Sequence, residues 1–408
     1  MIVTGLITEY NPFHFGHKLH LKKSIELGNS THTIAIMSGD FVQRGEPAIV
    51  NKWTRANMAI EQGVDLVIEL PTIFACQSAE YFAAGAMRLL DKLSIVNNFC
   101  FGSEAGSLED LSCISKILVD NPLEFQNLLK KFLDHGNSFP VARSKALVSY
   151  SKNDNWGDIL NNSNNILGIE YLKSKYKYNI DIEPLTIQRK GASYNDLDLN
   201  HTIASATAIR NKIFKDGLDS VSNYVPESTK TLLEIFQKDF GNFNRLNNYT
   251  QILNYNIASN FNHIKELPNF EIGLDFRIKK ASAQILPIED VISLIKTKRY
   301  TYTRIQRLLI HSLLNISDSK FHNLFDLGPQ YIRPLASNKK GLELLSLIKK
   351  NSSLPIISKF ANFTKNNAAL HYESLMLDKL ASDIFYLGLP SSPNAQFDFD
   401  FYKSFKIK

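Results

Sequence analysis

The sequence predicts an α/β fold for its first half, with a parallel sheet covered by helices on both faces, followed by a mostly α-helical second half. Short apolar runs alternate with helical patterns through about residue 215, and from about residue 220 the strand signal fades into long, apolar-periodic helices. Such alternation is typical of a three-layer, Rossmann-like domain. A chain of 408 residues is also long enough for two domains with substantial cores.

The expected elements follow one another in regular order. Strands are predicted at 2–8, 32–38, 64–70, 97–102 and 179–188, and helices at 17–28, 52–62, 78–92 and 165–176. Residues 107–163 interrupt the alternation with polar, helical sequence, which we interpret as an insertion. We therefore expect one domain over residues 1–215 and a helical domain over residues 216–408.

The composition excludes several classes of protein. Its 44% apolar and 21% charged residues are ordinary for a globular chain. We expect neither a membrane span nor a secretory leader, because no run of 18 apolar residues and no basic-then-apolar N-terminus occurs. Cys76, Cys100 and Cys113 lack Cys-x-x-Cys spacing and are expected to be reduced thiols of a cytoplasmic protein.

The most informative tract directly follows the first predicted strand and contains His-x-Gly-His. Pro12 stiffens a turn, and the free N–H groups of the next helix are then available to a phosphate. Gly16 lacks a Cβ, so a base or ribose can lie against the backbone. His14 and His17 lie on one helical face and can both reach charge that develops on an α-phosphate. The tract predicts an ATP site made of Ile7, Thr8, Glu9, Tyr10, Asn11, Pro12, Phe13, His14, Phe15, Gly16, His17, Lys18, Leu19 and His20.

Two other interpretations of these histidines are possible. As metal ligands, His14, His17 and His20 would point around the helix, and no Cys or carboxylate cluster nearby completes a site, so we predict no bound metal. A buried core histidine would explain one residue but not a pair that is interrupted by glycine at a strand-to-helix junction. The nucleotide interpretation is favoured.

Several later loops supply further candidates. The loop at 38–48 follows the second strand and offers Arg44 as an anion contact, although a plain surface turn is equally consistent. Gly102 ends a strand, where it permits a close ligand approach or only a turn. Asn164 either caps a helix or contacts ribose. Arg189 and Lys190 end a strand with two cations that suit a phosphate or the adenine face.

A second strong element lies at 203–210. Ser205 and Thr207 are at a helix start, and Arg210 follows three residues after Thr207 on the same side. This pattern places donors and one fixed cation around a β- or γ-phosphate. Ordinary helix capping by Ser205 is the alternative.

Positive charge is concentrated in the second half. Residues 291–350 contain 11 Lys or Arg and 3 Asp or Glu, a local charge of +8 in a chain whose net charge is +6. Cations suit phosphates and tyrosines suit unpaired bases, so a polyanionic partner, most simply RNA, is favoured over a solvated helix face. The predicted contacts are Lys296, Lys298, Arg299, Tyr300, Tyr302, Arg304 and Arg307.

Together these motifs resemble the tRNA(Met) cytidine acetate ligase family, within the His-x-Gly-His (HIGH-type) nucleotidyltransferase superfamily related to class I aminoacyl-tRNA synthetases. The matching elements are Glu-Tyr-Asn-Pro-Phe-His-x-Gly-His (9–17), Ser-Gly-x-Phe-Val-Gln-Arg-Gly-Glu-Pro-Ala (38–48), Asp-Leu-Val-Ile-Glu-Leu-Pro (65–71), Asn-Asn-Ile-Leu-Gly-Ile-Glu-Tyr (164–171), Ser-Ala-Thr-Ala-Ile-Arg (205–210) and Lys-Arg-Tyr-Thr (298–301).

The resemblance implies a Rossmann-like nucleotidyltransferase fold and a two-step ligase reaction. Acetate and ATP would give acetyl-adenylate, and the acetyl group would pass to the wobble cytidine of elongator tRNA(Met), giving N4-acetylcytidine. His14, His17 and Arg210 would be catalytic, with ATP, accompanied by Mg²⁺, in the 1–215 domain and tRNA on the 216–408 domain. One departure is Ala206, where the superfamily often has Ser. A Lys-Met-Ser-Lys-Ser element is also absent, so Arg210 would take the part of its lysine.

Two rival functions remain open at this point. One is an adenylyltransferase that acts on a small phosphorylated metabolite, which the additional basic, helical half disfavours. The other is a non-catalytic, ATP-dependent RNA-binding protein, which the intact His14, His17 and Arg210 disfavour.

Overall fold

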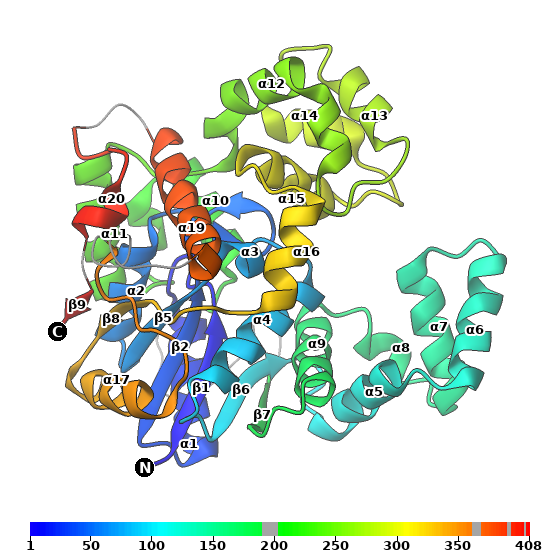
Figure 1. Ribbon diagram of the computed structural model, residues 1–408, viewed down its shortest axis with the longest axis horizontal. Coiled ribbons are helices and arrows are strands. Elements are labelled where there is room, and N and C mark those ends of the chain that lie inside the picture. Colours follow the sequence, from blue (N-terminus) through cyan, green and yellow to red (C-terminus); the bar gives the residue numbers. More distant parts are fainter. Residues whose placement is uncertain (190–202, 361–368, 390–392, 404) are drawn as a thin grey trace.

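A seven-stranded, mostly parallel sheet forms the centre of the molecule (Figure 1). The computed structural model describes residues 1–189, 203–360, 369–389, 393–403 and 405–408. The strand order is β7-β6-β1-β2-β5-β8-β9, with β8 antiparallel to β5. The strands are β1 (Val3–Thr8), β2 (His32–Ser38), β5 (Leu66–Leu70), β6 (Asn98–Ser103), β7 (Glu183–Gln188), β8 (Pro334–Ser337) and β9 (Lys406–Ile407). A separate hairpin is formed by β3 (Phe41–Val42) and β4 (Glu46–Pro47).

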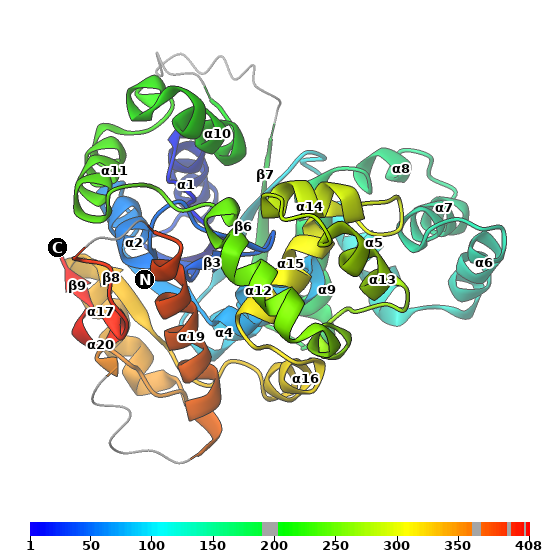
Figure 2. The ribbon, with the colours of Figure 1, turned by 90° about the horizontal axis from the view of Figure 1, so that it is seen from above.

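Helices cover both faces of the sheet, as the alternation predicts. Figure 2 shows α1 (Phe15–Gly28) and α2 (Lys52–Glu61) on one side, and α4 (Ala79–Lys92) and α9 (Ser163–Lys177) on the other. The central strands β2 and β5 are mostly apolar and are buried at every position. A sheet covered on both faces requires such continuous apolar runs, because neither side of the strand meets water.

The predicted insertion forms a helical lobe beside the β7 edge of the sheet (Figure 1). It contains α5 (Leu108–Asp120), α6 (Leu123–Asp134), α7 (Phe139–Ser151) and α8 (Trp156–Ile159). The first of these helices packs against α9, which anchors the lobe to the domain.

Part of the second half lies over the carboxyl ends of the strands. The helix α15 (Tyr302–Leu313) lies above the sheet together with its neighbours α12 (Thr250–Ser259) and α14 (Ile288–Ile295) (Figure 1). The remaining elements are α3 (Thr72–Ala75), α10 (Ala206–Asp216), η1 (Leu218–Val221), α11 (Glu227–Phe240), η2 (Leu246–Tyr249), η3 (Phe261–Glu266), α13 (Leu274–Ala281), α16 (Asp318–Leu327), α17 (Lys339–Asn351), α19 (Ala369–Leu387) and α20 (Phe399–Tyr402).

The C-terminal residues return to the central sheet, which the sequence analysis did not predict. The strand β8 pairs with β5, and β9 pairs with β8, so residues beyond 330 extend the sheet of the first half. These strands contain four and two residues. Such short segments leave no periodic signal, so the predicted boundary at residue 216 could not anticipate them.

The direction of chain travel reverses beside β1. From β1 the chain moves outward through β2 to β5, and it then crosses back to add β6 and β7 on the other side of β1. In sheets of this type ligands bind beyond the carboxyl ends of the strands that flank the reversal. Here those ends are Thr8 on β1 and Ser103 on β6.

A group of buried charges ties the C-terminus to the sheet. Lys52 Nζ lies 2.8 Å from Glu69 Oε1 and 2.8 Å from Asp400 Oδ2, and the Arg333 guanidinium contacts the same two carboxylates at 3.3 and 3.2 Å. None of these four side chains, which we call the buried charge cluster, is more than 3% exposed. Burial opposes ionisation of Asp400, but Arg333 and Lys52 hold the pKa of its carboxyl below the ordinary value.

Candidate functional site

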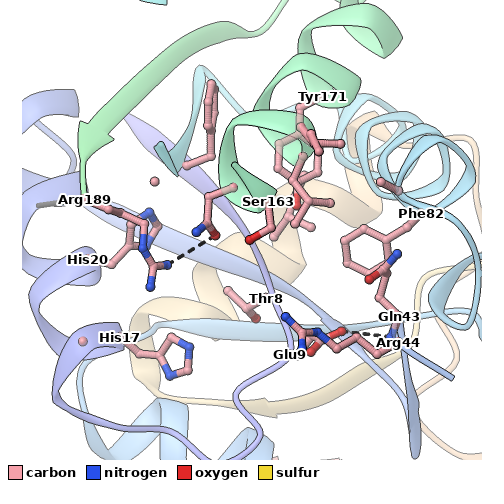
Figure 3. A pocket seen from close by; sticks show the side chains of 18 of the residues that line it. Thr8, Glu9, His17, His20, Gln43, Arg44, Phe82, Ser163, Tyr171 and Arg189 are labelled. Carbon is pink, nitrogen blue, oxygen red and sulfur yellow. Dashed lines mark hydrogen bonds between the residues drawn. The ribbon is translucent and has the colours of Figure 1, made fainter. Parts of the chain in front are cut away.

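A cavity of about 650 Å³ opens at the carboxyl ends of β1 and β6, where the chain direction reverses. Figure 3 shows side chains that converge on it from β1, α1, α9 and the β3–β4 hairpin. It is lined by Ile7, Thr8, Glu9, His14, Gly16, His17, His20, Gln43, Arg44, Ala79, Phe82, Phe101, Gly102, Ser163, Asn164, Ile166, Leu167, Tyr171, Arg189, Thr303 and Arg307.

The two histidines of His-x-Gly-His stack against each other at the start of α1. Their ring centroids are 3.7 Å apart, and the His14 backbone N–H donates to His17 Nδ1 at 3.3 Å. Since Nδ1 of a neutral His17 then accepts, its proton must be on Nε2, where it can be donated. A Cβ on Gly16 would lie 2.8 Å from His14 Cε1, so glycine is required for the His14 ring to occupy this position.

Both rings are uncharged at neutral pH. Burial, with Arg189 and Arg210 nearby, lowers the pKa of His14 to about 3. Burial, with the neighbouring His14 and His20, lowers the pKa of His17 well below its ordinary value. Among the described residues, His14 Nδ1 has no hydrogen-bond partner although it is buried. A buried polar atom without a partner is costly, so this face of the site is prepared for a polar ligand.

We expect the low pKa of His14 to appear in the pH dependence of stability. The unfolded chain binds a proton on this side chain near pH 6.5, whereas the folded chain does not until about pH 3, so its contribution to stability is lost as pH falls through this window. Relative to a His14→Asn variant, the wild-type free energy of unfolding should fall by about 2 kcal/mol between pH 6.5 and pH 5. Urea unfolding of both proteins at several pH values measures this; a constant difference would show that His14 titrates normally.

Buried polar groups fix the ends of β1 and β2 beside these histidines. The fully buried Arg55 donates to the carbonyl of Glu9 at 2.6 Å and to that of Gly39. The Glu9 carboxylate accepts from the Gln43 backbone N–H at 2.9 Å, and burial raises its pKa. Arg55 therefore supports the site from inside the protein, and neither Arg55 nor Lys52 lines the cavity.

The start of α9 forms the opposite wall. The Glu104 carboxylate accepts from the Asn164 side chain at 2.7 Å and from the Asn165 backbone N–H at 2.9 Å, so a carboxylate occupies the helix N-terminus. The residue that caps α9 is Asn162, so Asn164 lies inside the helix and faces the cavity. Arg189 reaches Asn164 Oδ1 at 3.5 Å, and its stem lies 2.9 Å from where a Cβ of Gly102 would be.

The helical second half completes the cavity. Thr303 and Arg307, both on α15, line it together with residues of the first half. Gly45, in the β3–β4 turn with φ of +81°, allows α15 to approach, since a Cβ there would lie 2.4 Å from the Arg307 backbone N. Arg307 was predicted as an RNA contact, and the structure places it in the cavity wall.

The 203–210 element lies beside this cavity and does not line it. The guanidinium of Arg210 donates to the carbonyl of Asn11 at 2.9 Å and pairs with Glu46 at 2.6 Å. Ser205 caps α10 by accepting from the Ala208 N–H at 3.2 Å, as its alternative interpretation predicted. Thr207 and Arg210 instead face a second cavity of about 360 Å³.

The basic segment leads directly into α15. Lys296, Lys298 and Arg299 are exposed, whereas Tyr300 is 6% exposed. Arg299 and Arg304 both pair with the Glu271 carboxylate at 2.8 Å and lie over the Tyr300 ring. The Tyr300 ring therefore faces protein in this conformation, and Tyr302 is half-buried at the helix start.

The structure brings together only part of the predicted ATP tract. The members that line the cavity are Ile7, Thr8, Glu9, His14, Gly16, His17 and His20. Tyr10 and Phe13 instead pack around the His17 ring at centroid distances of 5.0 and 5.5 Å. Asn11 holds the Ile49 backbone N–H at 2.8 Å. The predicted Lys190 lies outside the described residues.

Other lining residues had no signal that distinguished them in the sequence. Ala79 and Phe82 belong to an apolar helix face, and such positions are usually core. Thr303 lies about 300 residues from the first motif, and only the folded chain brings it close.

Two features are absent from the residues that the structure describes. They contain no group of three or more His, Cys, Asp or Glu side chains placed to hold a metal ion. No helix formed by these residues has the length and apolar character needed to cross a bilayer.

Comparison with known proteins gives consistent matches across the chain. The family described as HIGH Nucleotidyl Transferase matches residues 1–398. A Clostridium perfringens protein named tRNA(Met) cytidine acetate ligase is 45% identical over 381 residues, covering 91% of this chain and 93% of that protein. A Thermoanaerobacter pseudethanolicus protein of the same name is 45% identical over 402 residues, covering 98% of each. A crystal structure of Thermotoga maritima TmcAL bound with alpha-thio ATP superimposes with a TM-score of 0.92 at 34% identity, over all of both chains.

Proposed function

We propose, since this chain belongs to the HIGH nucleotidyl transferase family and within it to the tRNA(Met) cytidine acetate ligase family, that it is an ATP-dependent ligase that acetylates the wobble cytidine of elongator tRNA(Met). The product is N4-acetylcytidine. One observation carries the proposal: a single cavity joins the paired histidines of the nucleotide motif to α15, which continues directly from the exposed basic segment.

In the first step an acetate oxygen attacks the α-phosphorus of ATP. A new O–P bond forms, the bond to the leaving pyrophosphate breaks, and acetyl-adenylate results. Because acetate is a weak nucleophile and ATP is a polyanion, positioning and charge stabilisation must supply most of the acceleration. His17 donates from Nε2 to the charge on the phosphate, and His14 stacks beside it as a second neutral donor.

In the second step the exocyclic amine of cytidine attacks the acetyl carbon. A C–N bond forms, AMP leaves with the electron pair of the broken C–O bond, and the amine releases one proton. No side-chain nucleophile is needed. Residues 1–215 hold ATP, residues 216–408 hold tRNA, and α15 contributes to both.

The remaining predicted ATP-site residues have two kinds of role in this proposal. Gly102, Asn164, Arg189 and Lys190 would surround the nucleoside and its phosphates. Arg210 acts as a positioning residue, because its guanidinium holds the Asn11 carbonyl in the turn that precedes His14. Thr207 and Ser205 would orient the helix that carries Arg210.

Magnesium would enter bound to the ATP phosphates. Among the described residues that line the cavity, Glu9 provides the one carboxylate. This donor set fits Mg²⁺, which commonly keeps several waters and binds through one or two carboxylates plus substrate phosphates. The ion would supply neutralisation of phosphate charge, and Glu9 would be its protein contact.

The decisive experiment is mass spectrometry of nucleosides after incubation of the protein with ATP, acetate and total tRNA. N4-acetylcytidine should form only when all three are present. Pyrophosphate release with acetate alone should also exceed the background without acetate. Release only with a phosphorylated metabolite would favour an adenylyltransferase, and RNA binding with no pyrophosphate release would favour a non-catalytic protein.

Replacing Lys298 and Arg299 with alanine should weaken tRNA binding and leave adenylate formation intact. Each lost phosphate contact on single-stranded RNA should reduce the slope of log affinity against log salt by about 0.7. Arg299 is already paired with Glu271, so the double variant should lose between one and two such increments. A filter-binding titration at several salt concentrations measures the slope.

A matched control for this variant lies on the insertion. Lys130 and Lys131 are adjacent, exposed cations on α6. Their double alanine variant should keep the wild-type salt slope. If both double variants bind tRNA as the wild type does, the basic segment is only a solvated surface.

A further inference from the structure

The guanidinium of Arg307 has no acidic partner although the side chain is half-buried. It makes no hydrogen bond or ion pair with any other residue that the structure describes, whereas Arg304 on the same helix pairs with Glu271 at 2.8 Å. Burial is the main cause that lowers the pKa of Arg307. A half-buried cation without a counterion is unfavourable. Because Arg307 lies in a cavity wall, this indicates that a bound anion supplies its counterion.

Arg307 lies toward the end of the cavity away from the paired histidines, on the side of the β3–β4 turn. Its backbone contacts the β3–β4 turn at Gly45, two residues beyond Gln43. Figure 3 shows Gln43, Arg44 and Phe82 together at one side of the cavity, and His17, His20 and Arg189 at the other. Thr8 lies between the two groups, at the end of β1.

The walls beside Arg307 are suited to a small ligand with one apolar side. Ala79 and Phe82 project from the start of α4, and Tyr171 closes the cavity from α9. Phe82 is 3% exposed, so its ring is held in place by the core. A carboxylate that carries a methyl group would have partners for both ends here, the guanidinium for its oxygens and the apolar walls for its methyl group.

We propose that Arg307 binds the carboxylate of the small acid that is activated, and that Phe82 packs against its methyl group. This subsite rests on the proposed function and names the residues that select the acid. The planar guanidinium holds both carboxylate oxygens and presents one of them toward the α-phosphorus, which the His14–His17 pair contacts from the other side. In the step itself that oxygen forms the O–P bond and pyrophosphate leaves, so no proton is transferred.

The test is acetate-dependent ATP–pyrophosphate exchange without tRNA. The Arg307→Met variant should raise the KM for acetate by about 10- to 100-fold, as expected for loss of a charge-assisted, two-point contact, while the KM for ATP stays unchanged. The Arg307→Lys variant keeps the charge but not the planar fork, so its KM for acetate should fall between those of the wild type and Arg307→Met. It also provides a measurable protein if Arg307→Met does not fold.

Arg277 offers a matched control. It is an exposed arginine on α13, away from the residues that line the cavity, and Arg277→Met should show wild-type constants for both substrates. A second arm uses Phe82→Leu, which should raise the ratio of kcat/KM for propionate to that for acetate by about tenfold. An unchanged ratio would remove Phe82 from the subsite.

The possible failures are distinguishable. An increased KM for ATP with an unchanged KM for acetate would assign Arg307 to the triphosphate and overturn the inference. A loss confined to tRNA affinity would assign it to an RNA phosphate and overturn it equally. If the wild-type protein shows no acetate-dependent exchange, the proposed function itself fails.

Discussion

Replacing His17 with alanine should lower the rate of acetate-dependent pyrophosphate release by about 100- to 1000-fold, the usual effect of removing one preorganised donor to transition-state charge. The reason lies in the hydrogen bond from the His14 backbone N–H to His17 Nδ1. This bond fixes both the orientation of the ring and the tautomer that presents Nε2–H. The measurement is pyrophosphate release at saturating ATP and acetate.

A comparison with His135 separates chemistry from the general effect of losing an imidazole. His135 is exposed on the insertion, where its ring contacts the Lys131 carbonyl, and His135→Ala should keep the wild-type rate. The His17→Ala protein should retain ATP binding and a cooperative thermal transition. Turnover within a few-fold of the wild type would contradict a role for His17 in the transition state.

The second large effect concerns stability. Replacing Lys52 with methionine removes the cation that lies between Glu69 and Asp400 in the buried charge cluster. Arg333 alone must then balance two carboxylates that are almost completely removed from water. Breaking such a buried pair typically destabilises a protein by about 3–5 kcal/mol, because an uncompensated charge remains inside. Urea unfolding, followed by circular dichroism, should show this loss.

An exposed ion pair provides the reference for Lys52. Lys212 pairs with Asp216 at 3.2 Å on the surface of α10, and both side chains are about 40% exposed. Lys212→Met should change the free energy of unfolding by less than about 1 kcal/mol, since solvent screens the pair. Equal effects of the two substitutions would mean that the buried charge cluster does not stabilise the fold.

The sequence was sufficient for most of the parallel part of the fold, because its central strands are rich in apolar residues and are separated by helical patterns. The predicted strand at 32–38 coincides with β2, and those at 2–8, 64–70 and 97–102 match β1, β5 and β6 to within two residues at either end. The predicted strand at 179–188 began too early, because β7 starts at Glu183. Ile180 and Ile182 lie buried just before it. An apolar residue in the sequence indicates that its side chain is buried, but the first residue of a strand is set by where its backbone begins to hydrogen-bond to the neighbouring strand.

The site was predictable only where its residues are close in sequence. One short segment of sequence was enough to predict His14, Gly16 and His17 as site residues, because they lie within four positions of one another where a strand leads into a helix. The charge of Arg307 was visible, but its location was not: its neighbours in the sequence are basic, whereas its neighbours in space are Gly45 and the cavity wall. Lys52 and Arg55 likewise have the appearance of surface cations in the sequence and are fully buried in the fold.

The return of the C-terminus to the sheet has a consequence for synthesis on the ribosome. Lys52 and Glu69 leave the exit tunnel more than 300 residues before Asp400. At translation rates of about 5–20 residues per second, the nascent α/β domain must wait on the order of 15 to 70 seconds for its last counter-charge. Until residues 302–337 have also emerged, β5 has an unpaired edge and α15 cannot close the cavity. Chains that end before α15 therefore lack part of the cavity wall and leave the β5 edge open to chaperones and proteases, so the complete site forms only late in translation.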